Sequence, residues 1–193
     1  MEGLLNSAQT YFLVDCCSVH YFVFTDSSDD LDIDPRVQEV VTFVSIKHSS
    51  WPSATLRRFH VYLENANYWT GFDYVFAVDV DVRFMDFVGE EILGESTATL
   101  HADNGYYRGT EVTGVITTAL ANRSPEGVMW RQHAGVEPLL TRANYESRME
   151  STARVATDAG SYYFAGGLYG GRTTAVRRIL QKAVSGADQD AVR

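Results

Sequence analysis

The sequence has little positive charge for its size. Its 193 residues include 16 Lys and Arg against 25 Asp and Glu, which gives a formal net charge of −9. Binding to nucleic acid depends on clustered Lys and Arg that neutralise phosphates, so we expect no nucleic-acid partner. A nucleotide diphosphate would also be repelled by such a surface, and its binding would require a bound cation or a locally placed Arg.

Cysteine and long apolar runs are also scarce. The only two cysteines, Cys16 and Cys17, are adjacent in sequence, where a mutual disulfide is strained, so we predict no disulfide framework. No stretch reaches the roughly 20 apolar residues of a membrane-spanning helix, and residues 1–5 lack a basic region ahead of an apolar run. We expect the chain as given to be soluble, with membrane attachment only through an anchor outside this sequence.

What is present is enough apolar material for one domain. Hydrophobic residues make up 45% of the chain and aromatic residues 12%. A chain of roughly 150 residues already buries about two thirds of its unfolded surface, so we expect a single domain over residues 1–193. Residues 185–193 are polar, and we expect them to form a frayed tail.

Helical and strand patterns alternate along the chain. Strand patterns, rich in β-branched and aromatic residues, alternate with helical spacing of apolar residues. In order, they are a helix at 4–13, a strand at 19–26, a strand at 37–46, a helix at 54–64, a strand at 74–79 and, after a glycine-rich stretch, a helix from about 173 to 184. This order predicts an α/β fold with a mostly parallel sheet and flanking helices.

Two carboxylates follow the clearest of these strands. Asp79 and Asp81 come directly after a run that is apolar almost throughout, as a strand covered on both faces must be. Ligands of such sheets bind beyond the carboxyl ends of the strands, and two acids there can hold one hard cation with positions left for phosphates. The cation would stabilise a diphosphate leaving group. The alternative for Asp-x-Asp, which is common, is a pair of solvated turn residues.

Several motifs then stand in the same order as those of one known family. They are VHYFVFTD at 19–26, Trp51 with LRRF at 56–59, FDYVFAVDVDVRF at 72–84, VGEEIL at 88–93, ATLH at 98–101, NYE at 144–146 and GSYYFAGGLYGG at 160–171. Their joint order is far more specific than any one motif. The sequence resembles the α1,3-galactosyl and N-acetylgalactosaminyl transferases that include the histo-blood-group A and B enzymes.

The resemblance implies a retaining glycosyltransferase with a Rossmann-like, GT-A type nucleotide-sugar domain and Mn²⁺. It implies UDP-galactose or UDP-N-acetylgalactosamine as the donor and a galactosyl-terminated glycan or glycolipid as the acceptor of an α1,3 linkage. It also implies residence in the Golgi lumen or membrane.

The same resemblance assigns roles to individual residues. It implies Asp79 and Asp81 as metal ligands, His101 as an acceptor contact, and Arg58, Val80, Asp79, Ala165 and Gly167 as donor contacts. Glycine at 167 leaves room for an acetamido group and favours N-acetylgalactosamine, although glycine is also required wherever backbones crowd. A lone His is often structural, and either Arg57 or Arg58 is able to point inward from its helix.

The chain departs from the family pattern in two ways. It begins after the family segment that holds uracil and stops before the segment with the catalytic Glu, so we expect a member truncated at both ends with no assigned catalytic residue. We expect residues 103–133 to be an insertion, because His-Ala at 101–102 recurs at 133–134 and deleting the residues between restores the continuous family pattern. A retained intron or a faulty gene model would produce such a repeat. The competing hypotheses are a non-catalytic homologue or fragment that binds UDP and metal weakly or not at all, and a plain metal-binding or adhesive module.

Overall fold

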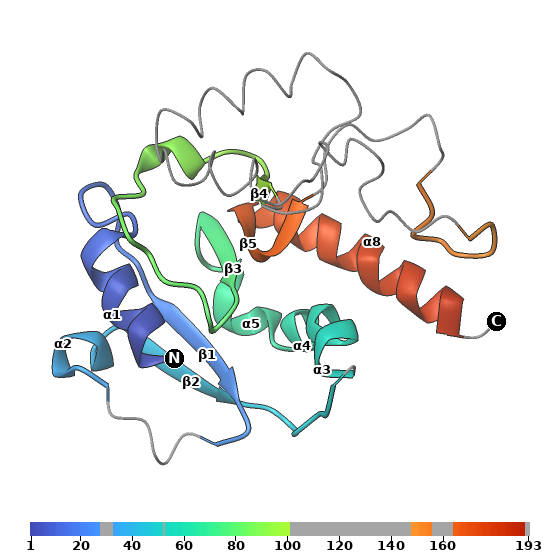
Figure 1. Cartoon of the computed structure of the whole chain (residues 1–193), viewed down its shortest axis with the longest axis horizontal. Helices are drawn as coiled ribbons and strands as arrows, with labels where there is room; N and C mark the ends of the chain where they lie inside the picture. The colour runs from blue at the N-terminus through green and yellow to red at the C-terminus, as the bar shows by residue number, and fades with distance from the viewer. Residues whose placement is uncertain (28–32, 52, 101–147, 156–163, 192–193) are drawn as a thin grey trace, which may run out of the picture. The chain divides into compact units, whose positions relative to one another are not determined.

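The structure is a computed structural model that describes residues 1–27, 33–51, 53–100, 148–155 and 164–191 (Figure 1). The chain divides into two compact units, one of Met1–Thr97 with Gly167–Asp188, the other of Ala98–Gly166 with Gln189–Arg193. Nearly all of the described secondary structure belongs to the larger unit. The expected insertion at 103–133 lies outside the described residues.

Helices and strands follow one another along the described chain, so the α/β class is confirmed, although the strand expected at 37–46 is preceded by a short helix that takes its first two residues and the helix expected at 54–64 is divided in two. The elements are α1 (Glu2–Tyr11), β1 (Tyr21–Thr25), α2 (Pro35–Gln38), β2 (Val41–Ser45), α3 (Ser53–Leu56), α4 (Arg58–Glu64), α5 (Ala66–Trp69), β3 (Tyr74–Val78), the 3₁₀ turn η1 (Glu90–Ile92), β4 (Thr97–Leu100), β5 (Phe164–Arg172) and α8 (Thr173–Ala191). Local chemistry explains where α2 begins, because Pro35 occupies the first turn and the Asp34 carboxylate accepts from the Arg36 amide at 2.9 Å.

The strands form two small sheets instead of the one mostly parallel sheet that we expected. β1 and β2 pair in parallel, from Tyr21 opposite Val41 to Thr25 opposite Ser45. The second sheet has the order β3-β5-β4, and β3 runs antiparallel to β5 with Val78 opposite Leu168. The prediction was wrong here because an apolar run indicates an extended strand but specifies neither its neighbour nor its direction.

Two glycines allow β5 to lie against its neighbours. A Cβ atom on Gly170 would lie 2.2 Å from the carbonyl oxygen of Val75, and one on Gly171 would lie 2.5 Å from that of Glu95. Gly171 also has a φ of +138°, which side chains rarely allow. The paired glycines of the sequence are therefore required for close backbone packing in the sheet.

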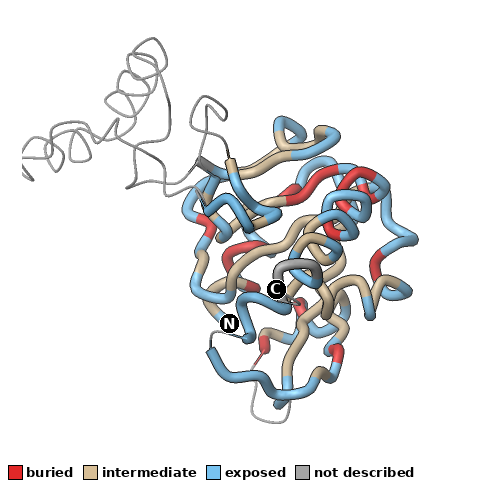
Figure 2. Tube along the Cα trace, turned by 90° about the vertical axis from the view of Figure 1, so that its right-hand side faces the viewer, coloured by how far each residue is buried: buried red, intermediate tan, exposed pale blue. Residues whose placement is uncertain are grey.

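Helix α8 packs on the α4–α5 region through a buried apolar cluster. Trp69, Val176 and Leu180 form its centre, and the indole Nε1 of Trp69 donates to the Tyr62 carbonyl at 3.0 Å. Buried positions are red in Figure 2. The helix continues to Ala191, so the expectation of a frayed tail is wrong for residues 185–191. One physical reason is that Asp188 is held by His60 at 2.9 Å.

Candidate functional site

The two acids lie in a tight turn at the carboxyl end of β3. The amide of Val82 donates to the carbonyl of Asp79 at 3.1 Å, which closes a β-turn over residues 79–82. The amide of Asp79 in turn donates to the carbonyl of Gly167 on β5 at 2.9 Å. Val80 is 55% exposed and Asp81 is exposed as well. The turn thus presents two carboxylates and one apolar side chain at the end of a half-buried strand.

Arg58 reaches this turn from the first residue of α4. Its Nη1 atom lies 3.0 Å from Oδ1 of Asp79, and its side chain is 23% exposed against 41% for the aspartate. Arg57 is exposed. The structure therefore resolves the choice that the sequence left open, because Arg58 is the arginine that faces the acids.

Two tyrosines surround the ion pair. Tyr62 lies one helical turn after Arg58, and Tyr169 lies on β5, with its ring edge-on to that of Phe59 at 6.2 Å between centroids. Burial raises the pKa of both tyrosines, and the positive charge of Arg58 partly opposes that rise. Both phenols are therefore neutral hydrogen-bonding groups at neutral pH.

The hydroxyl of Tyr169 is a buried polar atom next to these charges. It lies close enough to Arg58 and Tyr62 to influence the pKa values, yet its geometry falls short of a regular hydrogen bond with any described residue. An unsatisfied buried hydroxyl costs about 1–3 kcal/mol. A ligand that offered this hydroxyl a partner would recover part of that free energy.

The other predicted donor contacts lie on β5. Ala165 and Gly167 are two residues apart and therefore face the same side of the strand. Ala165 belongs to the smaller unit, whereas Gly167 belongs to the larger one. A Cβ atom at Gly167 would lie 3.6 Å from Val82 Cγ2, an ordinary contact, so packing alone does not require glycine here. His101, the predicted acceptor contact, lies outside the described residues.

Two carboxylates alone are too few to enclose a cation, so further ligands would have to come from a bound molecule. Within the described ranges, no cluster of three or more His, Cys, Asp or Glu side chains is arranged to hold a metal. Asp79 and Asp81 offer two carboxylates, and Asp79 already uses Oδ1 for Arg58. Small divalent cations are commonly held by one or two carboxylates plus substrate phosphates, which is the arrangement that this turn allows.

The sequence profile of glycosyltransferase family 6 matches residues 1–113, which include Arg58, Asp79 and Asp81. The chain belongs to this family. Relatives include the histo-blood group ABO system transferase 1 of Rattus norvegicus, 26% identical over 185 residues, and the globoside alpha-1,3-N-acetylgalactosaminyltransferase 1 of Canis lupus familiaris, 28% identical over 183. These matches cover 94% and 91% of this chain but 44% and 43% of the relatives. The resemblance noted from the motifs is confirmed, and this family 6 chain spans less than half the length of the curated relatives it matches.

Sequence reasoning missed the two tyrosines of the site. Tyr62 follows Arg58 at the i+4 spacing that places side chains on one helix face, and Tyr169 shares the strand face of Gly167. Both spacings were visible in the sequence. Neither identifies a site until Arg58 is known to point toward Asp79.

Proposed function

We propose that this family 6 chain forms the donor-binding side of a transferase that moves galactose or N-acetylgalactosamine from a UDP-sugar. The acceptor is a galactosyl-terminated glycan or glycolipid, and the new bond is an α1,3 linkage formed with retention. The observation that carries the proposal is the 3.0 Å contact between Arg58 and the first acid of the Asp79–Asp81 turn. It brings an anion-binding side chain and two candidate metal ligands to one strand end.

In this proposal Asp79 and Asp81 hold Mn²⁺, which when bound supplies Lewis-acid stabilisation of the departing UDP. Arg58 fixes the Asp79 carboxylate and directs its planar donor fork toward the diphosphate. The Tyr169 hydroxyl donates a hydrogen bond to an oxygen of the UDP-sugar, and Val80 and Gly167 contact the sugar. The bond between the anomeric carbon and the diphosphate breaks, the acceptor oxygen bonds to that carbon, and the proton of the acceptor hydroxyl passes to the departing UDP.

The finer fold and the location belong to the same proposal. A GT-A type, Rossmann-like domain accounts for the parallel β1–β2 pair and for acids at the carboxyl end of β3. The family resemblance supports a Golgi location. Among the helices in the described ranges, none combines the length and apolar character needed to cross a membrane.

The test is calorimetric titration of UDP with and without Mn²⁺. We expect UDP binding that depends on Mn²⁺ and that weakens at least about tenfold, or about 1.4 kcal/mol, when Asp79→Asn and Asp81→Asn are combined. Asp86→Asn is the matched control, because Asp86 is an exposed acid of the following loop that accepts from the Phe87 amide. Metal-independent UDP binding, or equal losses in the control, would contradict the proposal.

A second candidate is a homologue that binds the donor without catalysis. Its basis is that the arrangement around Arg58 and the Asp79–Asp81 turn supports donor and metal binding, and none of these residues is assigned to the chemical step. Incubation with UDP-galactose or UDP-N-acetylgalactosamine and a galactosyl acceptor separates the two candidates. Sugar transfer supports the enzyme, whereas Mn²⁺-dependent UDP binding without transfer supports the second candidate.

A further inference from the structure

The two cysteines of the chain lie together in a turn that the proposed donor site does not use. Cys16 and Cys17 are both free and exposed, and their Sγ atoms lie 2.7 Å apart. The whole sequence holds no other cysteine. Any chemistry of this chain that requires two thiols at once is therefore confined to this pair.

The fold holds the backbone of this turn in place. Leu13, whose φ is +57°, is buried in the core cluster around Phe12, and its amide donates to the Val88 carbonyl at 2.7 Å. Its carbonyl accepts from the Cys17 amide at 3.2 Å and from the Cys16 thiol at 3.7 Å. A leucine stays in the left-handed region only when the surrounding contacts fix it there. The two thiols thus project from an anchored turn.

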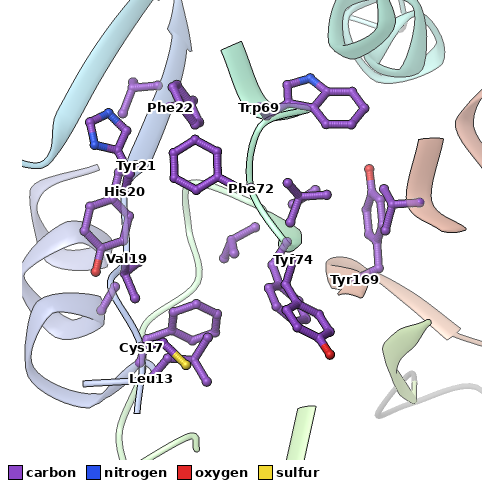
Figure 3. Close-up of a pocket in the computed structure, with 18 of the residues that line it drawn as sticks. Leu13, Cys17, Val19, His20, Tyr21, Phe22, Trp69, Phe72, Tyr74 and Tyr169 are labelled. Atoms are coloured by element: carbon purple, nitrogen blue, oxygen red, sulfur yellow. The ribbon is translucent and has the colours of Figure 1, made fainter. Parts of the chain in front are cut away.

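Both sulfur-bearing residues are reachable from solvent. Figure 3 shows Cys17 beside Leu13 among the residues that line a cavity of about 770 Å³, to which Tyr169 of the proposed donor site also contributes. Because both cysteines are exposed, a ligand of the sulfurs does not have to enter that cavity. The dithiol is therefore a surface feature of the larger unit, separate from the acids of the 79–82 turn.

Geometry disfavours a disulfide between the two sulfurs. The Cα atoms of adjacent residues lie about 3.8 Å apart across a trans peptide, whereas disulfides usually join Cα atoms roughly 4.4–6.8 Å apart. A bond between Cys16 and Cys17 would accordingly be strained and easily reduced. A bridge through a third atom lengthens the ring and relaxes this strain. The pair is thus better suited to chelate one atom than to form a disulfide.

The protonation of the pair narrows the class of ligand. The hydrogen bond with Cys17 raises the pKa of the Cys16 thiol to about 11, and the negative charge of Glu90 adds to the rise. A divalent cation binds thiolates and must displace the thiol protons, which a raised pKa opposes. Among the described residues, no third His, Cys, Asp or Glu joins the pair in a metal-binding arrangement. A ligand that takes up neutral thiols and releases no protons meets neither obstacle.

We propose that Cys16 and Cys17 form a chelating site for trivalent organoarsenicals, in which a soft, thiophilic arsenic atom carries one organic group and bonds both sulfurs. In the reaction with an arsine oxide, each sulfur forms one bond to arsenic, while both S–H bonds and the arsenic–oxygen bond break. The oxygen leaves as water with the two thiol protons, and no atom is oxidised or reduced. This site is independent of UDP and metal binding.

The test titrates the reduced chain with phenylarsine oxide and follows the reaction by intact mass spectrometry and a colorimetric count of free thiols. We expect one adduct per chain, with the mass of the reagent less one water, and loss of both thiols with one equivalent. Because the second bond is intramolecular, Cys16→Ser and Cys17→Ser should each bind at least about 100-fold more weakly. Alkylation of the remaining thiol and circular dichroism show that each variant is reactive and folded.

The contribution of the fold is measured against a short peptide with the sequence of residues 11–20, in which the cysteines are adjacent but the turn is not anchored by Val88. Holding both thiols in advance avoids the cost of ordering them, so the chain should bind at least about tenfold more tightly than the peptide. Affinity should change little between about pH 6 and about pH 7, because no protons are released. The proposal is overturned if either serine variant binds as tightly as the wild type, if chain and peptide bind equally, or if affinity rises steeply with pH.

Discussion

Replacing Gly170 by alanine should destabilise the pairing of β3 with β5. Gly170 lies opposite Phe76 in the register and is buried. Its new Cβ atom would meet the Val75 carbonyl oxygen at 2.2 Å, Phe76 Cδ1 at 2.4 Å and Phe76 Cα at 2.6 Å. Two of these atoms are backbone, so a change of rotamer cannot relieve the clash, and the strands must separate.

The expected loss is therefore at the upper end for overpacking, about 3 kcal/mol in the free energy of unfolding. For a domain of this size that corresponds to a fall of roughly 6–12 °C in the melting temperature. Urea unfolding followed by circular dichroism measures the first quantity, and the slope of the transition shows whether the unfolded reference has changed. Thermal melting measures the second.

Gly167→Ala is the matched control on the same strand. Its Cβ atom would make only the 3.6 Å contact with Val82 Cγ2, and loss of backbone freedom in the unfolded chain should make this variant neutral or stabler by up to about 1 kcal/mol. If Gly170→Ala unfolds at the same urea concentration as the wild type, or if both variants lose equal stability, the close approach of β5 to β3 is refuted.

Two further predictions concern charged and titrating groups. Arg58→Ala should lower the free energy of unfolding by no more than about 1 kcal/mol, because the ion pair with Asp79 is partly exposed, yet it should weaken Mn²⁺-dependent UDP binding about tenfold. Arg58→Lys keeps the charge and loses the planar donor fork, so its UDP affinity in calorimetry should lie between those of the wild type and Arg58→Ala. Unchanged UDP affinity in Arg58→Ala would contradict the role assigned to the arginine. Burial raises the pKa of Tyr21 from 10.0 to about 12, so the native state holds this proton more tightly and stability is lost as the pH rises from about 10 to about 12. Tyr21→Phe should lose less stability than the wild type over that interval in urea titrations, and equal losses would show that Tyr21 does not contribute.

The sequence predicted the local features of this protein well. Runs of β-branched and aromatic residues identified β1, β2 and β3, and the uninterrupted apolar run before Asp79 correctly indicated that the acids follow a strand. These predictions succeed because such side chains favour an extended backbone within each segment itself. The family motifs predicted the resemblance that the comparisons confirm.

What the sequence did not predict depends on distant contacts. The antiparallel pairing of β3 with β5 joins segments far apart in the chain, and no local period encodes a partner. The choice between Arg57 and Arg58 depends on how α4 is rotated against β3. The extension of α8 past Val184 includes a contact with His60 on another helix, which no pattern within residues 185–193 reveals.

The long connection between β3 and β5 has a consequence for variation within the family. Any segment added between register partners such as Val78 and Leu168 only lengthens a loop whose ends are already held together. The entropy of loop closure rises with the logarithm of length, by about 0.6 kcal/mol for each doubling. An insertion such as the one expected at 103–133 would thus be thermodynamically inexpensive, while the 79–82 turn stays bonded to β5 through the Asp79 amide and the Gly167 carbonyl.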